Sequence, residues 1–152
     1  MAEFQIREAA DGDLDVIVDF NARIANETEN KVLSRETLEA GVGAVSRDAD
    51  RGRYFVACTP QAVVGQLMIT TEWSDWRNGL WWWIQSVYVH PDYRGRGVFR
   101  ALFRHVERLA QERPDVVGLR LYVHRDNHAA RRVYERLGMQ DAEYLVLERE
   151  IE

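Results

Sequence analysis

The sequence lacks the features that would place it outside the cell or in a membrane. Its single cysteine, Cys58, cannot form a disulfide within the chain, which fits a reducing compartment. The longest unbroken apolar run, residues 80–84, is far shorter than the roughly 20 residues that cross a bilayer. The first residues have neither the basic start nor the apolar stretch of a secretory signal. We therefore expect a cytoplasmic protein with no membrane attachment.

Positive charges are outnumbered by negative ones and are unevenly distributed. The formal net charge is −5 and Lys31 is the only lysine, which argues against a dedicated nucleic-acid-binding protein, because such proteins usually present a basic face to phosphates. One stretch is an exception, since no acidic residue interrupts it: Arg94, Arg96, Arg100 and Arg104. We expect a local anion site there.

Metal-ligand spacings and a catalytic triad are also missing. Among the four histidines, His124 and His128 are four residues apart, but they straddle a predicted strand–helix junction. Ser86 has no histidine and aspartate near it in sequence. We therefore predict neither a metal site nor a serine nucleophile.

What the sequence does contain is the pattern of one globular domain spanning residues 1–152, with an apolar fraction of 46%. Two-residue alternation and helical spacing predict the elements in chain order. Strands are expected near residues 4–6, 54–58, 63–71, 80–89, 119–123 and 144–147, and helices after Asp11 or Asp13, after Ser34, at 97–112 and at 127–137, with a polar loop at 73–79. The strand–helix–strand unit at 80–124 predicts a parallel strand pair in a mixed α/β sandwich.

The strongest local signal lies between strand 80–89 and the helix that follows it. It reads Arg94-Gly95-Arg96-Gly97-Val98-Phe99. Glycines let backbone N–H groups approach an anion closely, and a helix N-terminus favours negative charge, so a pyrophosphate is the expected ligand. The chain has no Gly-Lys-Ser/Thr phosphate loop, and Arg100 stands where a dinucleotide fingerprint needs glycine or alanine. Taken alone, the stretch fits a glycine-rich turn on a basic surface equally well.

A second signal follows thirty residues later, in Asn127, Ala130, Tyr134 and Gly138. Together the two stretches resemble the GNAT superfamily of N-acetyltransferases, over nearly the whole chain and most closely over residues 80–139. The family's Gln/Arg-x-x-Gly-x-Gly/Ala motif for acetyl-CoA is matched through Gly97, whereas Phe99 stands where the family prefers a small residue. The later positions match its Asn-x-x-Ala-x-x-x-Tyr-x-x-x-Gly pattern.

The resemblance implies a fold and a cofactor site. The fold is α/β (α+β), with a mixed, mostly antiparallel sheet, a central parallel strand pair splayed around acetyl-CoA, and helices on both faces. The resemblance assigns to acetyl-CoA the backbone of Val87, Tyr88 and Val89 for pantetheine, Arg94, Gly95, Arg96, Gly97, Val98 and Phe99 for the pyrophosphate, and Asn127 and Tyr134. A homodimer is compatible with it.

For catalysis, Tyr134 is the predicted general acid that protonates the leaving thiolate. The strand at 81–86 has no carboxylate, which some family members carry there, and Gln85 cannot accept a proton. Glu72 is the first candidate base, directly or through water, followed by Glu27 and Glu29. Each of these carboxylates could equally be a solvated surface group.

The acceptor is expected to be a small cationic or amphipathic amine. An aromatic and acidic rim would suit such a molecule through cation–π and charge contacts, and the residues assigned to it are Glu27, Trp73, Trp76 and Trp83. Simple packing of a loop on the sheet explains the tryptophans about as well. Three other readings remain open: an acetyl-CoA sensor without catalysis, transfer of a longer acyl group, and a nucleic-acid module, which the net charge opposes.

Overall fold

The computed structural model describes residues 4–152. The chain divides into two compact units, of which the first ends at Tyr122 and the second comprises Val123–Glu152. We describe each unit by itself.

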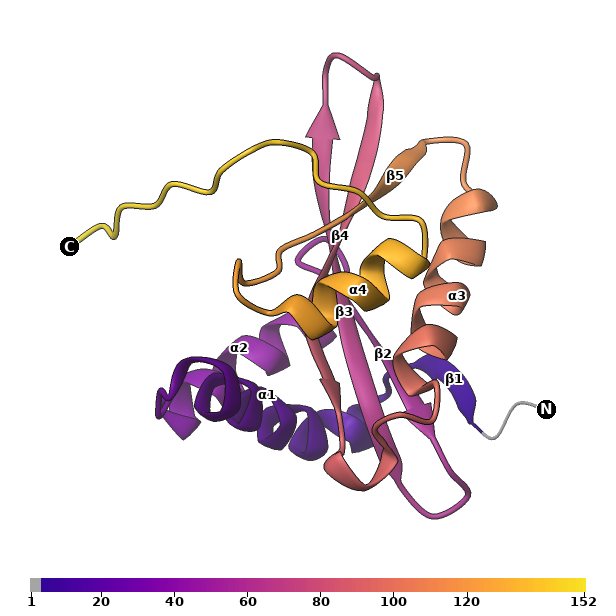
Figure 1. The fold of residues 1–152 in the computed structure, drawn as a ribbon. Helices are drawn as coiled ribbons and strands as arrows, with labels where there is room; N and C mark the ends of the chain where they lie inside the picture. The colour runs from indigo at the N-terminus through magenta and orange to yellow at the C-terminus, as the bar shows by residue number, and fades with distance from the viewer. Residues whose placement is uncertain (1–3) are drawn as a thin grey trace. The chain divides into compact units, whose positions relative to one another are not determined.

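The first unit is built on one five-stranded sheet with the order β1-β2-β3-β4-β5. The strands are β1 (Gln5–Glu8), β2 (Arg53–Cys58), β3 (Val63–Ser74), β4 (Gly79–Val89) and β5 (Val116–Leu121). Neighbours are antiparallel except β4 and β5, which pair in parallel. β3 and β4 form a long hairpin (Figure 1). Its tip extends beyond β2, because the pairing of β2 with β3 reaches only as far as Arg53↔Ile69.

Helices cover both faces of this sheet. α1 (Leu14–Glu29) and α2 (Arg35–Arg47) pack on one face, where Ile17, Val18 and Val42 meet Tyr54 and Val56 of β2. α3 (Val98–Gln111) lies on the opposite face (Figure 1). Its apolar stripe is fully buried and comprises Val98, Leu102, Phe103, Val106 and Ala110. Burial of these two apolar layers holds the sheet in place.

Two glycines allow close approaches that position the later site. A Cβ on Gly65 of β3 would lie 2.7 Å from Cγ1 of Val98, so glycine lets the start of α3 press against the sheet. A Cβ on Gly118 of β5 would lie 2.5 Å from Cζ3 of Trp81, so glycine leaves room for that indole.

In the second unit, α4 (His128–Arg136) is the only helix between residues 123 and 152. Asn127 caps it, because its Oδ1 accepts a hydrogen bond of 3.1 Å from the N–H of Ala130. Gly138 follows with φ of +91°, the left-handed conformation typical of a helix C-terminus.

Most expected elements are confirmed, including the mixed sheet, the parallel pair and the cap at Ser34, whose Oγ accepts a hydrogen bond of 3.2 Å from the N–H of Thr37. Alternation over residues 81–83 of β4 also holds: Trp82 is 2% exposed on the α3 face, whereas Arg120 lies over both Trp81 and Trp83 on the other. Cys58 is buried, as expected.

Three expectations are wrong in their bounds or kind. The predicted strand 144–147 is absent: residues 139–152 contain no strand, and Tyr144, Leu145, Val146 and Leu147 are all exposed, without the alternating burial of a strand. The predicted polar loop 73–79 is a tight turn at 75–78, because β3 keeps pairing with β4 to Ser74↔Gly79. β5 begins earlier than expected and ends at Leu121, because its parallel ladder with β4 starts at Val116.

Candidate functional site

The site begins with a length of β4 that extends beyond its parallel neighbour. The ladder between β4 and β5 ends at Ile84↔Leu121, although β4 continues to Val89. Among the strands of the described chain, residues 85–89 therefore have a partner on the β3 side alone. No strand of the described chain pairs with them on the β5 side, where an extended ligand can bind as an added strand.

A β-bulge interrupts the same stretch. The register with β3 shifts between Gln66↔Tyr88 and Met68↔Gln85, which leaves one extra residue in β4. Ser86 has φ of +50°, a left-handed conformation that non-glycine residues rarely adopt. The bulge reverses the alternation of side chains, so Tyr88 points to the α1 face, where its ring packs 5.0 Å from that of Phe20.

A buried polar network supports the bulge from beneath. Gln66 is completely buried, and its Nε2 donates hydrogen bonds to the carbonyl of Ser86 (3.0 Å) and to Oδ1 of Asn21 (3.1 Å). Asn21 in turn donates to the hydroxyl of Tyr54 at 3.1 Å, and burial raises the pKa of that phenol. The sequence prediction missed this network, although a glutamine between Gly65 and Leu67 in an otherwise apolar strand was a visible signal.

The arginine–glycine turn follows β4 and opens directly into α3. Gly95 and Gly97 have φ of +77° and +82°, and a Cβ built on either would meet no heavy atom within 4 Å. Gly97 is the N-cap residue of α3, no side chain caps the helix there, and its first turn contains no acidic residue. The start of α3 thus lacks a side-chain cap and an acidic neighbour, and it carries the positive end of the helix dipole, which suits a phosphate.

The side chains of this turn are arranged around those N–H groups. Val98 is buried against the sheet, and the Phe99 ring lies 6.1 Å from that of Phe103 on the same helix. Arg96 lies 5.2 Å from the centroid of the Tyr93 ring. The turn therefore offers backbone donors first, with Arg96 and Arg100 as exposed cations on either side of Gly97.

Arg94 makes its own contacts within the protein. Its Nε donates to the carbonyl of Val89 at 2.9 Å, and its Nη2 donates to Oε1 of Glu27 at 2.8 Å. The guanidinium also lies 5.3 Å over the ring of Tyr88. This arrangement ties the end of β4 to α1.

Glu27 accepts two hydrogen bonds at the bulge. The Tyr88 hydroxyl donates to Oε2 at 2.5 Å, and Arg94 occupies the other oxygen. The hydrogen bond from Tyr88 and that from Arg94 lower the pKa of Glu27, while burial and the carboxylate raise the pKa of Tyr88. Glu27 is therefore a carboxylate at neutral pH, located beside the unpaired part of β4.

Glu72 belongs to an aromatic cluster nearer the hairpin. It accepts a hydrogen bond from Nε1 of Trp83 at 2.8 Å and forms a 3.3 Å ion pair with Arg120 of β5. The Arg120 guanidinium lies 3.9 Å from the centroid of the Trp81 ring, and the Trp83 and Tyr122 rings are 4.6 Å apart. The cluster presents one carboxylate among several aromatic faces.

The structure does not bring all the predicted acceptor residues together. Trp73 at the end of β3 and Trp76 in the hairpin turn are 59% and 91% exposed. Trp73 pairs with Leu80, eight residues before Tyr88. At about 3.3 Å per residue, that separation is about 26 Å along the strand. Glu27 at the bulge and the two tryptophans at the hairpin thus lie at opposite ends of β4.

Tyr134 lies in the second unit, on α4. Its side chain is half-buried, and burial raises the pKa of its phenol. The hydroxyl therefore keeps its proton at neutral pH, as a proton donor must.

The described part of the chain holds neither a cluster of metal ligands nor a membrane-spanning helix. Residues 4–152 contain no group of three or more His, Cys, Asp or Glu side chains that could hold a metal ion. Over the same residues, no helix is both long and apolar enough to span a bilayer.

Comparison with known proteins identifies the family of the chain. The Acetyltransferase (GNAT) family profile matches residues 18–139. The chain belongs to the GNAT family of acetyltransferases, enzymes that transfer acyl groups and use acetyl-CoA.

Individual relatives agree with that assignment. A mycothiol acetyltransferase of Amycolatopsis mediterranei (strain U-32) is 30% identical over 111 residues, which are 72% of this chain and 34% of that protein. The chain thus matches about a third of the relative's length. A possible acetyltransferase from Clostridium difficile 630 superposes with a TM-score of 0.91 at 43% identity, covering 99% of both chains. A predicted acetyltransferase from Clostridium acetobutylicum, solved with acetyl-CoA, has the same fold, with a TM-score of 0.77, 20% identity, and 95% and 96% of the two chains covered.

Proposed function

We propose that this chain transfers the acetyl group of acetyl-CoA to a primary amine of a small cationic acceptor, by direct attack of the amine on the thioester. The observation that carries the proposal is the unpaired stretch of β4 at 85–89, which leads directly to the uncapped N-terminus of α3. A strand edge suits an extended arm bearing amides, and a bare helix N-terminus suits a pyrophosphate. The strand edge precedes the helix N-terminus along the chain, so the two features follow the order of the pantetheine arm and the pyrophosphate in acetyl-CoA.

The binding roles follow from that fit. Backbone groups of Val87, Tyr88 and Val89 hold the pantetheine arm, and the N–H groups from Gly95 to Phe99 hold the pyrophosphate. Arg96 adds a charge-assisted donor, whereas Arg94 fixes the turn through Val89 and Glu27. Asn127 caps α4 and is proposed, from the family resemblance, to contact the pantetheine as well.

Acetyl-CoA supplies the acetyl group as a thioester, and the residues of the chain manage charge and protons. N–H groups at the bulge around Tyr88 polarise the thioester carbonyl. A lysine-like amine has a pKa of about 10.4, so releasing its proton at pH 7 costs about 4–5 kcal/mol. Tyr134, which keeps its proton, protonates the departing thiolate.

The residue that takes the proton from the amine is proposed from position and charge. Glu72 stays the first candidate from the sequence, through a chain of waters, although it pairs with Trp81, about 23 Å along β4 from Tyr88 at about 3.3 Å per residue. Glu27 is nearer the bulge, but its lowered pKa makes it a weak base and suits it better to binding the cationic amine. Glu29 stays a third candidate.

Several broader expectations accompany this proposal. The relative named mycothiol acetyltransferase supports a small-molecule acceptor. One domain over residues 1–152, a cytoplasmic location, a homodimer, and the absence of metal, nucleic-acid and membrane partners all stay predictions. So do the roles of Trp73, Trp76 and Trp83 in binding the acceptor.

The test is release of free thiol from acetyl-CoA in the presence of a panel of small amines. We expect acetyl-CoA to raise the melting temperature, and cationic amines to be acetylated faster than anionic ones. Tyr134→Phe should lower kcat by about 10²-fold or more, with the Kd for acetyl-CoA little changed. Binding of acetyl-CoA without turnover of any amine would indicate a sensor, and faster turnover of longer acyl-CoAs would indicate a different acyl group. Failure of acetyl-CoA to bind would disprove the proposal.

A further inference from the structure

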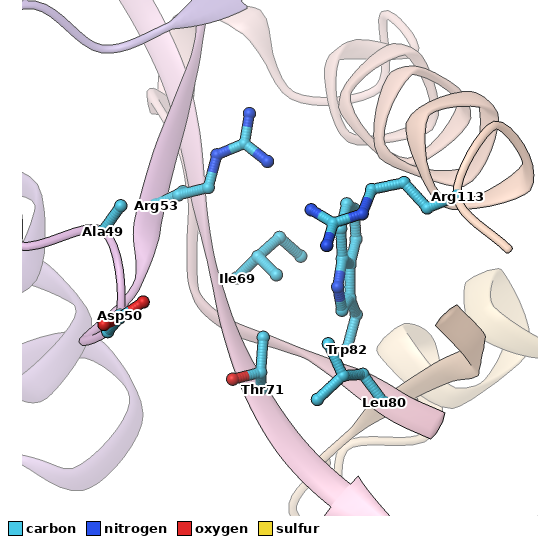
Figure 2. Close-up of a pocket in the computed structure, with 8 residues that line it drawn as sticks. All are labelled: Ala49, Asp50, Arg53, Ile69, Thr71, Leu80, Trp82 and Arg113. Carbon is cyan, nitrogen blue, oxygen red and sulfur yellow. The ribbon is translucent and has the colours of Figure 1, made fainter. Parts of the chain in front are cut away.

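A separate cavity lies on the α3 face of the sheet, at the far end of α3 from the arginine–glycine turn. It encloses about 220 Å³ between β2, β3, β4 and the segment after α3 (Figure 2). Its lining comprises Ala49, Asp50, Arg53, Ile69, Thr71, Leu80, Trp82 and Arg113. With a rise of about 1.5 Å per residue, the fourteen residues of α3 separate it from the candidate transfer site by about 21 Å.

Two arginines flank the cavity, and each is held from behind by a carboxylate. Glu8 binds Nε and Nη2 of Arg53 at 3.0 and 2.9 Å, and Asp115 binds Nε and Nη2 of Arg113 at 3.1 and 2.9 Å. Both guanidinium groups are therefore fixed in orientation by a two-point contact.

The remaining edge of each guanidinium is turned to the cavity. Within residues 4–152, Nη1 of Arg53 and Nη1 of Arg113 take part in no hydrogen bond. Figure 2 shows the two groups reaching toward each other across the cavity. They are close enough for Arg113 to oppose the positive charge of Arg53, an effect that an anion between them would relieve.

The floor beneath the arginines is apolar. Ile69 and Trp82 are each 2% exposed, and the Arg113 guanidinium lies 5.8 Å from the centroid of the Trp82 ring. Asp50 is the only acidic residue of the lining, and Figure 2 places it on the side away from Arg113. The cavity volume is that of about seven water molecules in the liquid, at ~30 Å³ each, which suits a ligand of amino-acid size.

We propose that this cavity binds a small carboxylate with an apolar body, its carboxylate between Arg53 and Arg113 and its apolar part on Ile69, Leu80 and Trp82. A simple carboxylic acid and an apolar α-amino acid share this chemistry. The amino acid carries in addition an ammonium group that Asp50 can bind. The proposal does not depend on acetyl transfer.

Three probes with the same aromatic body test the proposal: 3-phenylpropanoate, L-phenylalanine and 2-phenylethylamine. The readout is the indole N–H resonance of Trp82 in ¹⁵N spectra of the full chain, assigned with Trp82→Phe. We expect both carboxylates to shift this resonance to saturation and the amine to leave it unchanged. Tighter binding of phenylalanine identifies an amino acid as the ligand class, and tighter binding of phenylpropanoate identifies a simple acid.

Variants show whether the carboxylates bind at this cavity. Arg113→Gln and Arg53→Gln should each weaken carboxylate binding about tenfold or more, whereas Arg108→Gln, which removes an exposed charge from the last turn of α3, should not. Saturating acetyl-CoA should leave the titration unchanged. The proposal is wrong if neither carboxylate saturates, if the amine binds equally well, if Arg108→Gln weakens binding as much as the cavity variants do, or if acetyl-CoA competes.

Discussion

Gln66 donates a hydrogen bond of 3.0 Å from Nε2 to the carbonyl of Ser86, the residue of the β4 bulge that has a positive φ. The donor is completely buried on β3, and its own Oε1 has no hydrogen-bond partner in the described chain. An unsatisfied buried amide oxygen costs about 1–3 kcal/mol. This cost is consistent with the proposed mechanism, in which N–H groups at the bulge polarise the thioester carbonyl.

Gln66→Met tests that mechanism. It keeps the size of the side chain and removes both donors, so the bulge should relax and kcat should fall about tenfold or more, with a smaller change in KM for acetyl-CoA. Steady-state kinetics with both substrates varied measures this split. Gln61→Met makes the same chemical change at an exposed position and should leave kcat unchanged. Unaltered kcat in Gln66→Met would show that the bulge does not need this hydrogen bond.

Gly97→Ala should weaken binding of acetyl-CoA. At φ of +82°, a Cβ costs about 1–2 kcal/mol and shifts the first N–H groups of α3. We expect the Kd measured by calorimetry to rise about tenfold. Gly138→Ala is the matched control, because φ there is +91° and open space surrounds it as well, so it should cost similar stability and leave the Kd unchanged. Equal effects of the two variants on the Kd would contradict the role of Gly97.

Gly118→Ala should destabilise the parallel strand pair. Its Cβ would lie 2.5 Å from Cζ3 of Trp81, and such overpacking costs about 1–3 kcal/mol, which denaturant unfolding measures. Gly41→Ala, in α2 with nothing within 4 Å, should instead stabilise the protein by about 0.5–1 kcal/mol. In a Trp81→Leu background the penalty at Gly118 should shrink. A penalty that does not depend on residue 81 would mean that the indole is not its cause.

Asp13 should make stability depend on pH in the acidic range. Arg7 binds its two oxygens at 2.7 and 3.1 Å, and this contact lowers the pKa of Asp13 in the folded state. The stabilisation of the folded state by this ion pair is therefore complete above the pKa of about 3.9 that Asp13 has in the unfolded chain. It is lost as the pH falls through the lower pKa of the folded state.

Asp13→Asn should accordingly lower the free energy of unfolding at pH 7 by about 1.5–3 kcal/mol and flatten its decline below pH 4. Urea unfolding between pH 7 and pH 2 measures both effects. Asp11→Asn changes an exposed neighbour and is the control. The same flattening in both variants would remove Asp13 as the source.

The raised pKa of Tyr134 has its own consequence for the pH profile of turnover. A proton donor works while protonated, and a pKa above the usual value of about 10 keeps the phenol protonated through pH 9. We expect kcat to show no alkaline decline below that pH, and Tyr134→Phe to lower the whole profile. An alkaline decline near pH 8 that disappears in Tyr134→Phe would contradict the assignment.

The sequence predicted those parts of the fold and site that depend on local pattern. Helix α3 shows an apolar stripe at helical spacing, and the turn at Gly95 and Gly97 needs glycine for its positive φ, so both could be recognised from residue types alone. The same holds for Asn127 and Ser34, whose side chains cap the helices that follow them.

Features that depend on pairing between distant strands could not be predicted in this way. Residues 144–147 have strand-forming side chains, but the segment is exposed and forms no strand. The bulge at Ser86 arises from a register shift against β3, and Glu27 reaches Tyr88 across 61 positions of sequence. Such contacts depend on how elements pack, which propensity does not encode.

The open side of β4 at residues 85–89 also bears on how the enzyme behaves in solution. A strand that lacks a neighbour is a template for another chain, and such edges promote aggregation. Concentrated enzyme without its cosubstrate is therefore expected to associate edge to edge and precipitate sooner than enzyme stored with coenzyme A. By covering this strand edge, the cosubstrate would also protect the protein against self-association.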